Sequence, residues 1–419
     1  VEVEASARTW NYRWTRNYGS AHRSVAEPGR EGEDELAVGS ARWAPDRRSV
    51  VLPLPALVPA DQVALEFALV VEGEEVLEEE VMLTANWVPG EPPLLRQREE
   101  CAEEVAAPWI ELQGADGPGR GKRIVLISGD EEYRSEECLP ALARILAEQH
   151  GFDCTVLFSV DPGSGRVDPN DQVFTPGLER IEGADLVVLF TRFREWPDSA
   201  MRHFAAHVEA GKPLLGLRTS THAFQYDRDP GSPFARYSTR GGGTWDGGFG
   251  REVLGETWIA HHGAHGSEAT RGVVAVGAET HPILRGVESV FGPTDVYRAR
   301  ALPEDAVVLL EGEVVAGMDP ADPAVAGKKN EPRMPILWTR ERPVGDAVQR
   351  VVTSTIGSAQ DFTSEGLRRA WVNACYWLLG MEDAISARAA VPLPADYEAV
   401  PFGFGRFRKG RRPADWAPR

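Results

Sequence analysis

The stretch that decides the fold of most of this chain is KRIVLISGDEEYRSEECLPALARILAEQHG, residues 122–151. It begins with the continuous apolar run KRIVLIS, which is typical of a strand buried on both faces. After the polar turn GDEEYR comes SEECLPALARILAEQHG, an amphipathic helix pattern that Gly151 ends. A buried strand followed directly by a helix is the unit from which parallel sheets covered by helices are built.

The same pattern of apolar strands and amphipathic helices continues along the chain. Further buried strands are predicted at CTVLFSV (154–160), ADLVVLFT (184–191) and KPLLGLR (212–218), and helices at SAMRHFAAHVEAG (199–211) and EGLRRAWVNACYWLLG (365–380). Alternation of continuous apolar strands with helices implies a mainly parallel sheet with both faces covered. We therefore predict an α/β domain over residues 122–382.

The chain before this domain has a different pattern. The runs SVVLPLPAL (49–57), QVALEFALVV (62–71) and EEVMLTANWV (79–88) are short, rich in β-branched residues and separated by Pro, Gly and Asp. Residues 1–95 therefore predict a small all-β, sandwich-like domain. Residues 96–121 are interpreted as a linker with a short helix, and residues 383–419 as a Pro/Gly-rich C-terminal tail.

Composition limits the classes of function. The 419 residues carry a net charge of −19, which argues against nucleic acid or an anionic membrane as the main partner. No apolar run approaches the roughly 18 to 20 residues that a membrane span needs. The four cysteines are scattered without a CxxC pair, which predicts buried free thiols at Cys101, Cys138, Cys154 and Cys375. Because the chain starts at Val1 without a signal pattern, we expect a trimmed or partial chain.

Polar residues gather directly after three of the predicted strands. Ligands of such sheets bind outside the carboxyl ends of the strands, so these residues predict one shared pocket. They are Asp130, Glu131, Glu132, Arg134, Glu136 and Glu137 after the first strand, Arg192 and Arg194 after the third, and Arg218, Thr219, Ser220 and His222 after the fourth.

A histidine-rich segment follows later, WIAHHGAHG, with His261, His262 and His265. Imidazoles separated by three or four residues can face one site, and histidine is a common metal ligand. The candidate metal ligands are His222, His262 and His265. A glycine-rich loop whose histidines bond the backbone is the alternative, because no carboxylate is fixed by spacing as in HExxH. TDVY, with Asp295 and Tyr297, is a further polar cluster, for which a capped turn is the alternative.

From Lys122 onward the sequence resembles the trehalose-utilisation (ThuA-like) family, in a larger form common in planctomycete-type bacteria. The motifs that carry the resemblance are GDEEYRSEECLPALARIL, LFTRFREWPD, GLRTSTHAF, GGFGREVLGETWIAHHGAHG, HPILRGV, GPTDVY, GKKNEPRMPILWT and RRAWVNACYWLLGMED. The resemblance implies a flavodoxin-like three-layer α/β/α sandwich, similar to class I glutamine amidotransferases, and a role in disaccharide and keto-sugar catabolism. The first 90 residues or so resemble β modules that end secreted planctomycete sugar-dehydrogenase-like and haem proteins, which implies an extracytoplasmic location without excluding a cytoplasmic one.

GLRTSTHAF stands where the amidotransferases carry Gly-aliphatic-Cys-x-Gly, so that Arg218 takes the place of the cysteine. Without the thiolate, glutamine hydrolysis by that route is excluded. Thr219 or Ser220 could replace the nucleophile only with an adjacent base, for which His222 is the nearest candidate in sequence.

The leading hypothesis is an enzyme that acts on a disaccharide or keto-glycoside by acid–base chemistry, as an isomerase, lyase or hydrolase. The candidate catalytic residues are His222, His262, His265, Glu132, Glu136 and Glu137, and the candidate substrate contacts are Arg134, Arg192, Arg194, Arg218, Thr219, Ser220, Trp258, Asp295 and Tyr297. The hypothesis allows a divalent metal as cofactor and a homo-oligomer as the assembled form. The alternatives are a non-catalytic sugar-binding module and a Ser/Thr-dependent hydrolase.

Overall fold

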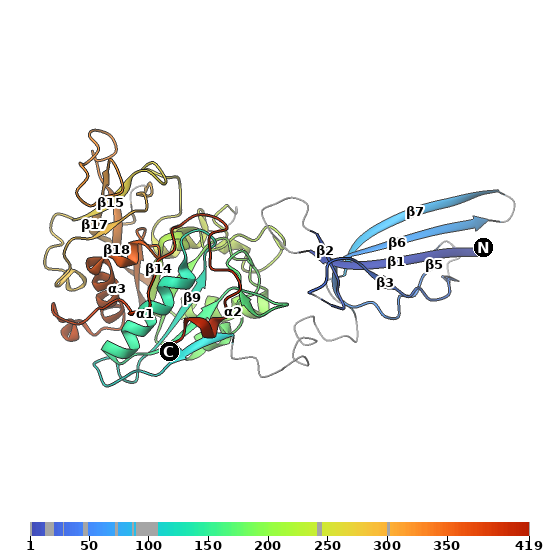
Figure 1. Cartoon of the computed structure of the whole chain (residues 1–419), viewed down its shortest axis with the longest axis horizontal. Coiled ribbons are helices and arrows are strands. Elements are labelled where there is room, and N and C mark those ends of the chain that lie inside the picture. The colour runs from blue at the N-terminus through green and yellow to red at the C-terminus, as the bar shows by residue number, and fades with distance from the viewer. Residues whose placement is uncertain are drawn as a thin grey trace. The chain divides into compact units, whose positions relative to one another are not determined.

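The structure is a computed structural model that describes residues 2–12, 21–27, 29–44, 49–71, 74–85, 88, 108–240, 245–299 and 302–418. It divides into two compact units, Val1–Val105 and Ala106–Arg419 (Figure 1). Each unit is described by itself.

The smaller unit is an antiparallel sheet in the strand order β2–β1–β6–β7, with β3 also paired to β1. In Figure 1 the long strands β1, β6 and β7 run side by side. Its strands are β1 (Glu2–Tyr12), β2 (His22–Arg23), β3 (Asp34–Leu36), β6 (Ala60–Val71) and β7 (Glu74–Ala85), with β4 (Arg42–Trp43) and β5 (Val50–Val51) forming a separate short pair.

This antiparallel unit does not show a second layer over β7. Val81, Met82 and Leu83 are 42%, 49% and 37% exposed. Successive side chains of a strand point to opposite faces, so exposure of three in a row means that described residues cover neither face there. The buried cluster is small and centres on Ala60 and Val63. The predicted β unit is therefore present, whereas its sandwich-like layering is not seen in the described part of the chain.

The larger unit is built on a ten-stranded mixed sheet in the order β16–β15–β17–β18–β19–β14–β13–β9–β10–β8. The strands are β8 (Trp109–Leu112), β9 (Arg123–Gly129), β10 (Asp153–Phe158), β13 (Leu186–Thr191), β14 (Leu214–Leu217), β15 (Ala269–Val274), β16 (Phe291–Gly292), β17 (Ala306–Val315), β18 (Met334–Val344) and β19 (Ala347–Ser354). A separate two-stranded pair joins β11 (Val160–Asp161) to β12 (Arg166–Val167).

The prediction of a mainly parallel sheet is corrected by this topology. Only β10, β9, β13, β14 and β19 pair in parallel, and antiparallel strands extend the sheet on both sides. Part of the reason is a hairpin, in which β18 and β19 are joined by the two residues Gly345 and Asp346, with φ of 57° at the glycine. Such a short connection can link only antiparallel strands.

Three α-helices cover the two faces of the parallel strands (Figure 1). They are α1 (Ser135–His150), α2 (Asp198–Glu209) and α3 (Glu365–Leu378). Alternate residues of β9 fall into two separate apolar clusters: Ile124 and Leu126 pack with α1 and α3, and Val125 and Ile127 pack with α2. The period of two along the strand assigns α1 and α3 to one face and α2 to the other. The remaining turns are the 3₁₀-helices Leu178–Gly183, Arg218–His222, Ala235–Tyr237, Pro282–Leu284, Asp361–Thr363, Glu382–Ala384 and Pro413–Trp416, and the π-helix Gly250–Leu254.

The predicted linker and tail both contribute to the larger unit. Within residues 96–121, β8 pairs antiparallel with β10 and so forms the edge of the sheet. The short helix expected earlier in this segment lies outside the described residues. The tail returns to the first βα turn, where the Gly403 N–H donates to the Glu132 carbonyl over 2.7 Å. Residues 398–408 therefore pack against the carboxyl end of β9.

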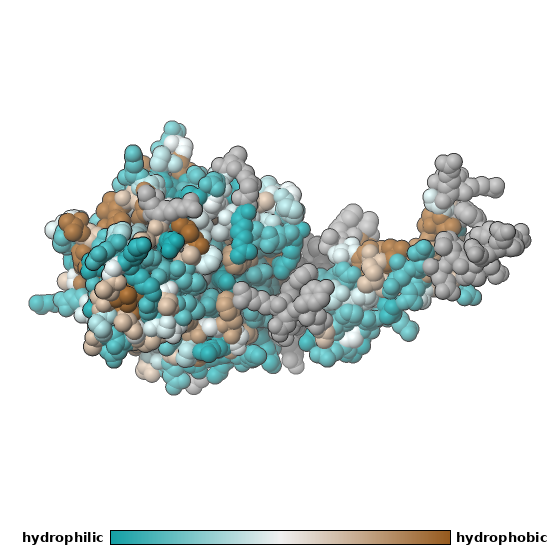
Figure 2. All heavy atoms as spheres, turned by 90° about the horizontal axis from the view of Figure 1, so that it is seen from above, coloured by the Kyte–Doolittle hydropathy of each residue, from teal (hydrophilic) through white to brown (hydrophobic). Residues whose placement is uncertain are grey.

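Two further expectations concern thiols and membranes. Cys138, Cys154 and Cys375 are free and buried, as expected, whereas Cys101 lies outside the described residues. Among the described helices, none combines the length and apolar character needed to cross a membrane. Hydrophilic and hydrophobic residues are intermixed over the face of the larger unit that Figure 2 shows.

Candidate functional site

The loops that follow β9, β13 and β14 meet at the carboxyl edge of the sheet. Glu131, after β9, accepts from Arg192 Nη1 over 2.7 Å and from Arg194 Nη2 over 3.2 Å, both after β13. Thr219, after β14, donates its hydroxyl to Asp130 over 2.7 Å. Neighbouring parallel strands bring these turns together, as the sequence predicted.

Arg218 occupies a strained turn at the end of β14. Its φ of 43° lies in the left-handed region, which residues other than glycine seldom adopt. The side chain is fully buried, and its Nη1 donates to the backbone carbonyls of Asp295 (2.7 Å) and Thr355 (2.6 Å). The guanidinium also lies over two aromatic rings, 3.7 Å from the centroid of Tyr297 and 4.5 Å from that of Tyr133.

Asp295 is the centre of the polar cluster. Its side chain is fully buried and accepts from Arg218 Nη2 (3.0 Å), His261 Nδ1 (2.8 Å) and His265 Nδ1 (3.0 Å). Burial alone would raise the pKa of Asp295, but the hydrogen bonds from the two histidines and the charge of Arg218 lower it well below its usual range. Asp295 is therefore a permanent buried anion that positions two imidazoles, and it is not itself exposed for contact with a substrate.

Both ring nitrogens of His265 are occupied. Nδ1 bonds Asp295, and Nε2 lies 3.3 Å from Glu132 Oε1. The hydrogen bonds to Asp295 and Glu132 raise the pKa of His265 to about 9, against the opposing effect of burial. His265 is thus an imidazolium between two carboxylates, with no nitrogen left for a substrate unless Glu132 moves.

His261 differs from His265 in its second nitrogen. Its Nδ1 donates to Asp295, whereas Nε2 has no hydrogen-bond partner among the described residues. The side chain is 38% exposed, and its ring centroid lies 5.8 Å from that of Trp258 and 5.7 Å from that of Tyr297. A histidine that donates one nitrogen to a buried carboxylate and presents the other to solvent is arranged to take up a proton there.

His222 lies beside this cluster without joining its hydrogen bonds. It shares two aromatic neighbours with His261, with ring centroids 5.4 Å from Trp258 and 6.3 Å from Tyr297. Burial lowers the pKa of His222 well below its ordinary value, and the nearby Arg192 lowers it further. A buried imidazole that stays neutral forms part of the wall of the site.

The candidate metal ligands are regrouped by the geometry. His261, His265 and Asp295 each offer a ligand atom, and these atoms lie within 4.8 Å of one another. His262 is directed elsewhere, because its Nε2 donates to the Lys329 carbonyl over 2.9 Å. Of the three histidines expected to bind a metal, only His265 belongs to this group within the described part of the chain.

Several other candidate residues have structural partners outside the cluster. Glu137 accepts from Val400 N–H and Arg408, so it anchors the tail. Arg134 donates to the carbonyls of Glu131 and Gly403. Glu136 is buried with its nearest cation, Arg134 Nη1, 3.6 Å away, and burial raises its pKa to about 8. Glu136 and Glu137 therefore do not reach the histidines.

The two candidate nucleophiles are also occupied. Ser220 is buried and donates its hydroxyl to the Leu189 carbonyl over 2.7 Å, and Thr219 donates to Asp130. The nearest side-chain contact of His222 Nδ1 is the hydroxyl of Thr221, at 3.3 Å. No described contact links His222 to the hydroxyl of Ser220 or Thr219, so this arrangement lacks the base that activates a hydroxyl nucleophile.

Three residues of the site were not among the predicted ones. His261 carries the free nitrogen, Tyr133 packs under Arg218, and Phe402 of the tail stacks on Tyr133 (5.7 Å between centroids) and lies 5.3 Å from His265. The paired histidines of the tripeptide HHG, residues 261–263, were a visible signal for His261. Nothing in the sequence indicated that the tail would return to this edge of the sheet.

No family model and no curated protein match the chain. Among solved structures it is similar to a protein from Parabacteroides merdae described as ThuA-like, with 14% identity and a TM-score of 0.41 over 71% of this chain and 99% of that one. It is also similar to the mmIFT52 N-terminal domain, with 11% identity and a TM-score of 0.32 over 61% of this chain and 97% of that one. A third likeness is to the glutaminase domain of Trypanosoma brucei CTPS with bound acivicin, with 10% identity and a TM-score of 0.31 over 65% of this chain and 98% of that one. These identities and TM-scores are low, so the likenesses carry no conclusion about the chemistry of this chain.

Proposed function

We propose that the larger unit is a ThuA-like enzyme that acts on a disaccharide or keto-glycoside by acid–base chemistry, with His261 as the general base. The observation that carries the proposal is the pair formed by buried Asp295 and half-exposed His261, whose Nε2 is open to solvent among the described residues. The substrate class comes from the resemblance of the sequence motifs to the ThuA-like family. On this proposal the larger unit is a variant of the flavodoxin-like, amidotransferase-like sandwich.

In the proposed reaction His261 Nε2 removes a proton from a carbon next to the sugar carbonyl, or from a hydroxyl. Asp295 stabilises the imidazolium that forms and keeps the ring in the tautomer with its proton on Nδ1. The imidazolium of His265, held by Asp295 and Glu132, places a positive charge 4.7 Å from the His261 ring, between centroids.

The surroundings of His261 suit a sugar. Trp258 is partly exposed beside the His261 ring, and aromatic rings stack on the apolar faces of sugars. Arg194 is engaged through all three nitrogens by backbone carbonyls and Glu131, so it is not a free donor for substrate. Arg192 bonds Glu131 through Nη1, and its Nε is buried without a hydrogen-bond partner among the described residues. We therefore assign substrate contact to Trp258 and retain Arg218, Asp295 and Tyr297 as positioning residues.

The test compares two adjacent histidines. His261→Gln should lower kcat on keto-disaccharides by about 10²–10⁴-fold, the usual contribution of a positioned acid–base group. His262→Gln is the matched control, because His262 bonds a backbone carbonyl outside the cluster, and it should retain activity within about threefold. A His261→Gln protein with more than a tenth of the parent's kcat would contradict the assignment.

A divalent metal held by His261, His265 and Asp295 is a second candidate, favoured by the spacing of their ligand atoms. Such an ion would polarise the substrate carbonyl as a Lewis acid. Metal analysis of the purified protein, followed by chelation and re-addition of metal, distinguishes a metal site from His261 acting as a base without metal. Loss of activity on chelation with recovery on adding one divalent metal favours the metal, and unchanged activity favours His261 alone.

A non-catalytic sugar-binding module is the alternative from another class. Thermal stabilisation of the protein by keto-disaccharides, with no product detected by mass spectrometry, would support it.

A further inference from the structure

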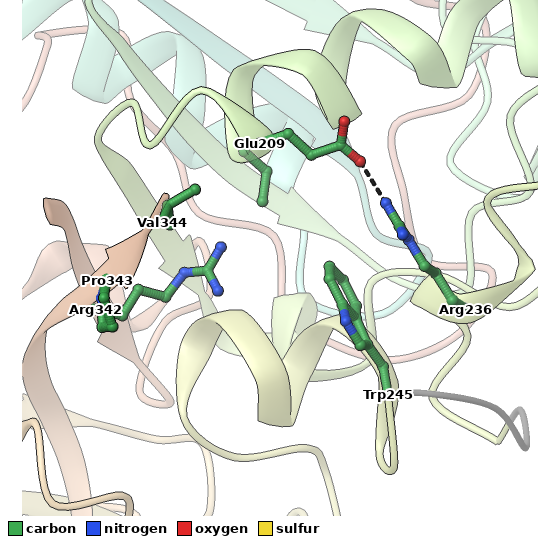
Figure 3. Close-up of a pocket in the computed structure, with 7 residues that line it drawn as sticks. Glu209, Arg236, Trp245, Arg342, Pro343 and Val344 are labelled. Atoms are coloured by element: carbon green, nitrogen blue, oxygen red, sulfur yellow. Dashed lines mark hydrogen bonds and ion pairs between the residues drawn. The ribbon is translucent and has the colours of Figure 1, made fainter. Parts of the chain in front are cut away.

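A cavity lies at the opposite edge of the sheet from the histidine cluster. It has a volume of about 540 Å³ and is lined by Val208, Glu209, Arg236, Trp245, Arg342 and Val344, among others (Figure 3). Val208 and Glu209 end α2, just before β14 begins, and Arg342 and Val344 end β18, just before β19 begins. The cavity is therefore near the amino ends of β14 and β19, whereas Arg218 and the histidine cluster follow their carboxyl ends.

Arg342 is a buried cation whose two terminal nitrogens have no hydrogen bond or ion pair among the described residues. The residue is 8% exposed, and only its Nε is engaged, donating to Gln349 Oε1 over 2.7 Å. In Figure 3 the guanidinium extends from β18 into the cavity, toward Trp245. Neither terminal nitrogen is among the buried polar atoms that lack a partner, so both are open to the cavity, where they can donate to an anion that is not part of the chain.

The position of this guanidinium is fixed before any ligand arrives. Gln349 lies directly opposite Arg342 on β19 and donates its own Nε2 to the Lys212 carbonyl over 2.6 Å. Arg340, two residues earlier on the same face of β18, is satisfied by Asp305 and by the carbonyls of Glu252 and Val253. Arg340 and Arg342 thus occupy equivalent positions on the strand, but only the terminal nitrogens of Arg342 lack a partner among the described residues.

The other walls of the cavity supply no competing anion. The carboxylate of Glu209 is paired with Arg236, and Arg236 also lies over the Trp245 ring, 5.0 Å from its centroid. Trp245 packs on Tyr237 with 4.8 Å between centroids, so its ring is held in place. The cavity therefore combines one unpaired cation with one aromatic face.

We propose that this cavity binds a small organic oxyanion, with Arg342 on its carboxylate or phosphate and Trp245 against the apolar face of its sugar ring. A guanidinium offers two parallel N–H donors that match either oxyanion. The volume is in the range of about 300–1,000 Å³ that small-molecule sites occupy. The proposal is independent of the chemistry assigned to His261.

The experiment is isothermal titration calorimetry of the full chain with glucuronate and with glucose 6-phosphate, and with glucose as the neutral control. At least one of the two anions should bind and glucose should not, and comparison of the two separates a carboxylate site from a phosphate site. Arg342→Gln should weaken binding by about 10- to 100-fold, because charged hydrogen bonds of this kind are lost. Arg342→Lys should give a smaller loss, since the charge remains and the fork is absent.

Two further variants keep the proposal testable if Arg342→Gln does not fold. Trp245→Ala leaves the cation in place and should weaken binding of the sugar anions by roughly tenfold. His261→Gln should leave the affinity unchanged, because His261 is at the other edge of the sheet. Absence of binding by both anions, or binding that Arg342→Gln, Arg342→Lys and Trp245→Ala do not affect, would overturn the proposal.

Discussion

Arg218 and Asp295 form a salt bridge of 3.0 Å in which neither side chain is exposed to solvent. The bridge joins the strained turn after β14 to the segment that faces His261 and His265. Arg218 is therefore a structural cation. By its position Arg218 orients the carboxylate that holds both histidines, so the proposed chemistry is centred on the segment of His261 and His265 and not on the turn after β14.

Replacement of Arg218 by Met should destabilise the larger unit strongly. The change removes the cation and leaves the buried carboxylate of Asp295 with one charged partner fewer. Breaking a buried ion pair in this way costs about 3–5 kcal/mol. Urea unfolding at neutral pH measures the change in the free energy of unfolding.

The matched control is Arg120→Met. Arg120 also pairs with an aspartate, Asp116, but the two side chains are 81% and 96% exposed, and exposed pairs contribute roughly 0–1 kcal/mol. Equal destabilisation by the two substitutions would show that burial of the Arg218–Asp295 pair has no special role.

Glu136 should make stability depend on pH. Burial raises its pKa to about 8 in the folded protein, whereas the unfolded carboxyl titrates near its ordinary value of 4.5. Between these two values the unfolded chain loses the proton and the folded chain keeps it, so the free energy of unfolding falls as the pH rises. Glu136→Gln cannot titrate, so its stability relative to the parent should increase from about pH 5 to pH 8.

The measurement is urea unfolding of parent and variant at several pH values in that window. Glu148→Gln removes a negative charge from the same helix at a side chain that is 49% exposed and serves as the control. A difference between Glu136→Gln and the parent that is constant across the window would contradict a raised pKa for Glu136.

The parallel strands could be predicted because each carries its own signal. Strands β9 and β13 are buried on both faces, so they appear in the sequence as continuous apolar runs. The antiparallel extension was not predicted, because strands such as β18, MPILWTRERPV, contain prolines and place two arginines in a polar stretch, so they form no continuous apolar run. The two-residue turn Gly345-Asp346 between β18 and β19 was a local hairpin signal that was missed, whereas the pairing of β8 with β10 joins segments separated by β9 and α1.

The candidate site was predicted at the level of loops and missed at the level of atoms. His261 and His262 are adjacent and chemically identical in the sequence. Only the backbone direction separates them, since His261 pairs with Tyr297 in an isolated bridge that turns its side chain toward Asp295. His262 is turned toward Lys329 instead. Periodicity could not make that choice, because it follows from how two distant segments pair.

The tail should loosen when its anchor in α1 is removed. Glu137 accepts from the Val400 N–H (2.9 Å) and from Arg408 Nε (3.2 Å), so Glu137→Ala deletes two charge-assisted contacts. Hydrogen bonds to charged groups contribute about 1.5–3 kcal/mol each, which corresponds to amide exchange faster by one or more orders of magnitude. Hydrogen–deuterium exchange of the peptide spanning residues 398–408 measures this change in the amide exchange rate.

Glu398→Ala is the control for the tail. Glu398 lies 3.6 Å from the same arginine, Arg408, but its side chain is 82% exposed, so its loss should change the exchange little. Unchanged exchange in the Glu137→Ala protein would mean that the tail is held by its aromatic contacts, including that of Phe402 with Tyr133.

Ser220→Ala should leave turnover nearly unchanged, because the Ser220 hydroxyl is buried and donates to the Leu189 carbonyl. The loss of that bond affects stability by roughly 1 kcal/mol and removes no group that reaches the substrate. A fluorophosphonate probe should accordingly fail to label the parent protein at Ser220 or Thr219. Labelling that is abolished by Ser220→Ala, together with a fall in kcat of more than about 10³-fold, would instead establish the Ser/Thr-dependent hydrolase and displace His261 from its proposed role.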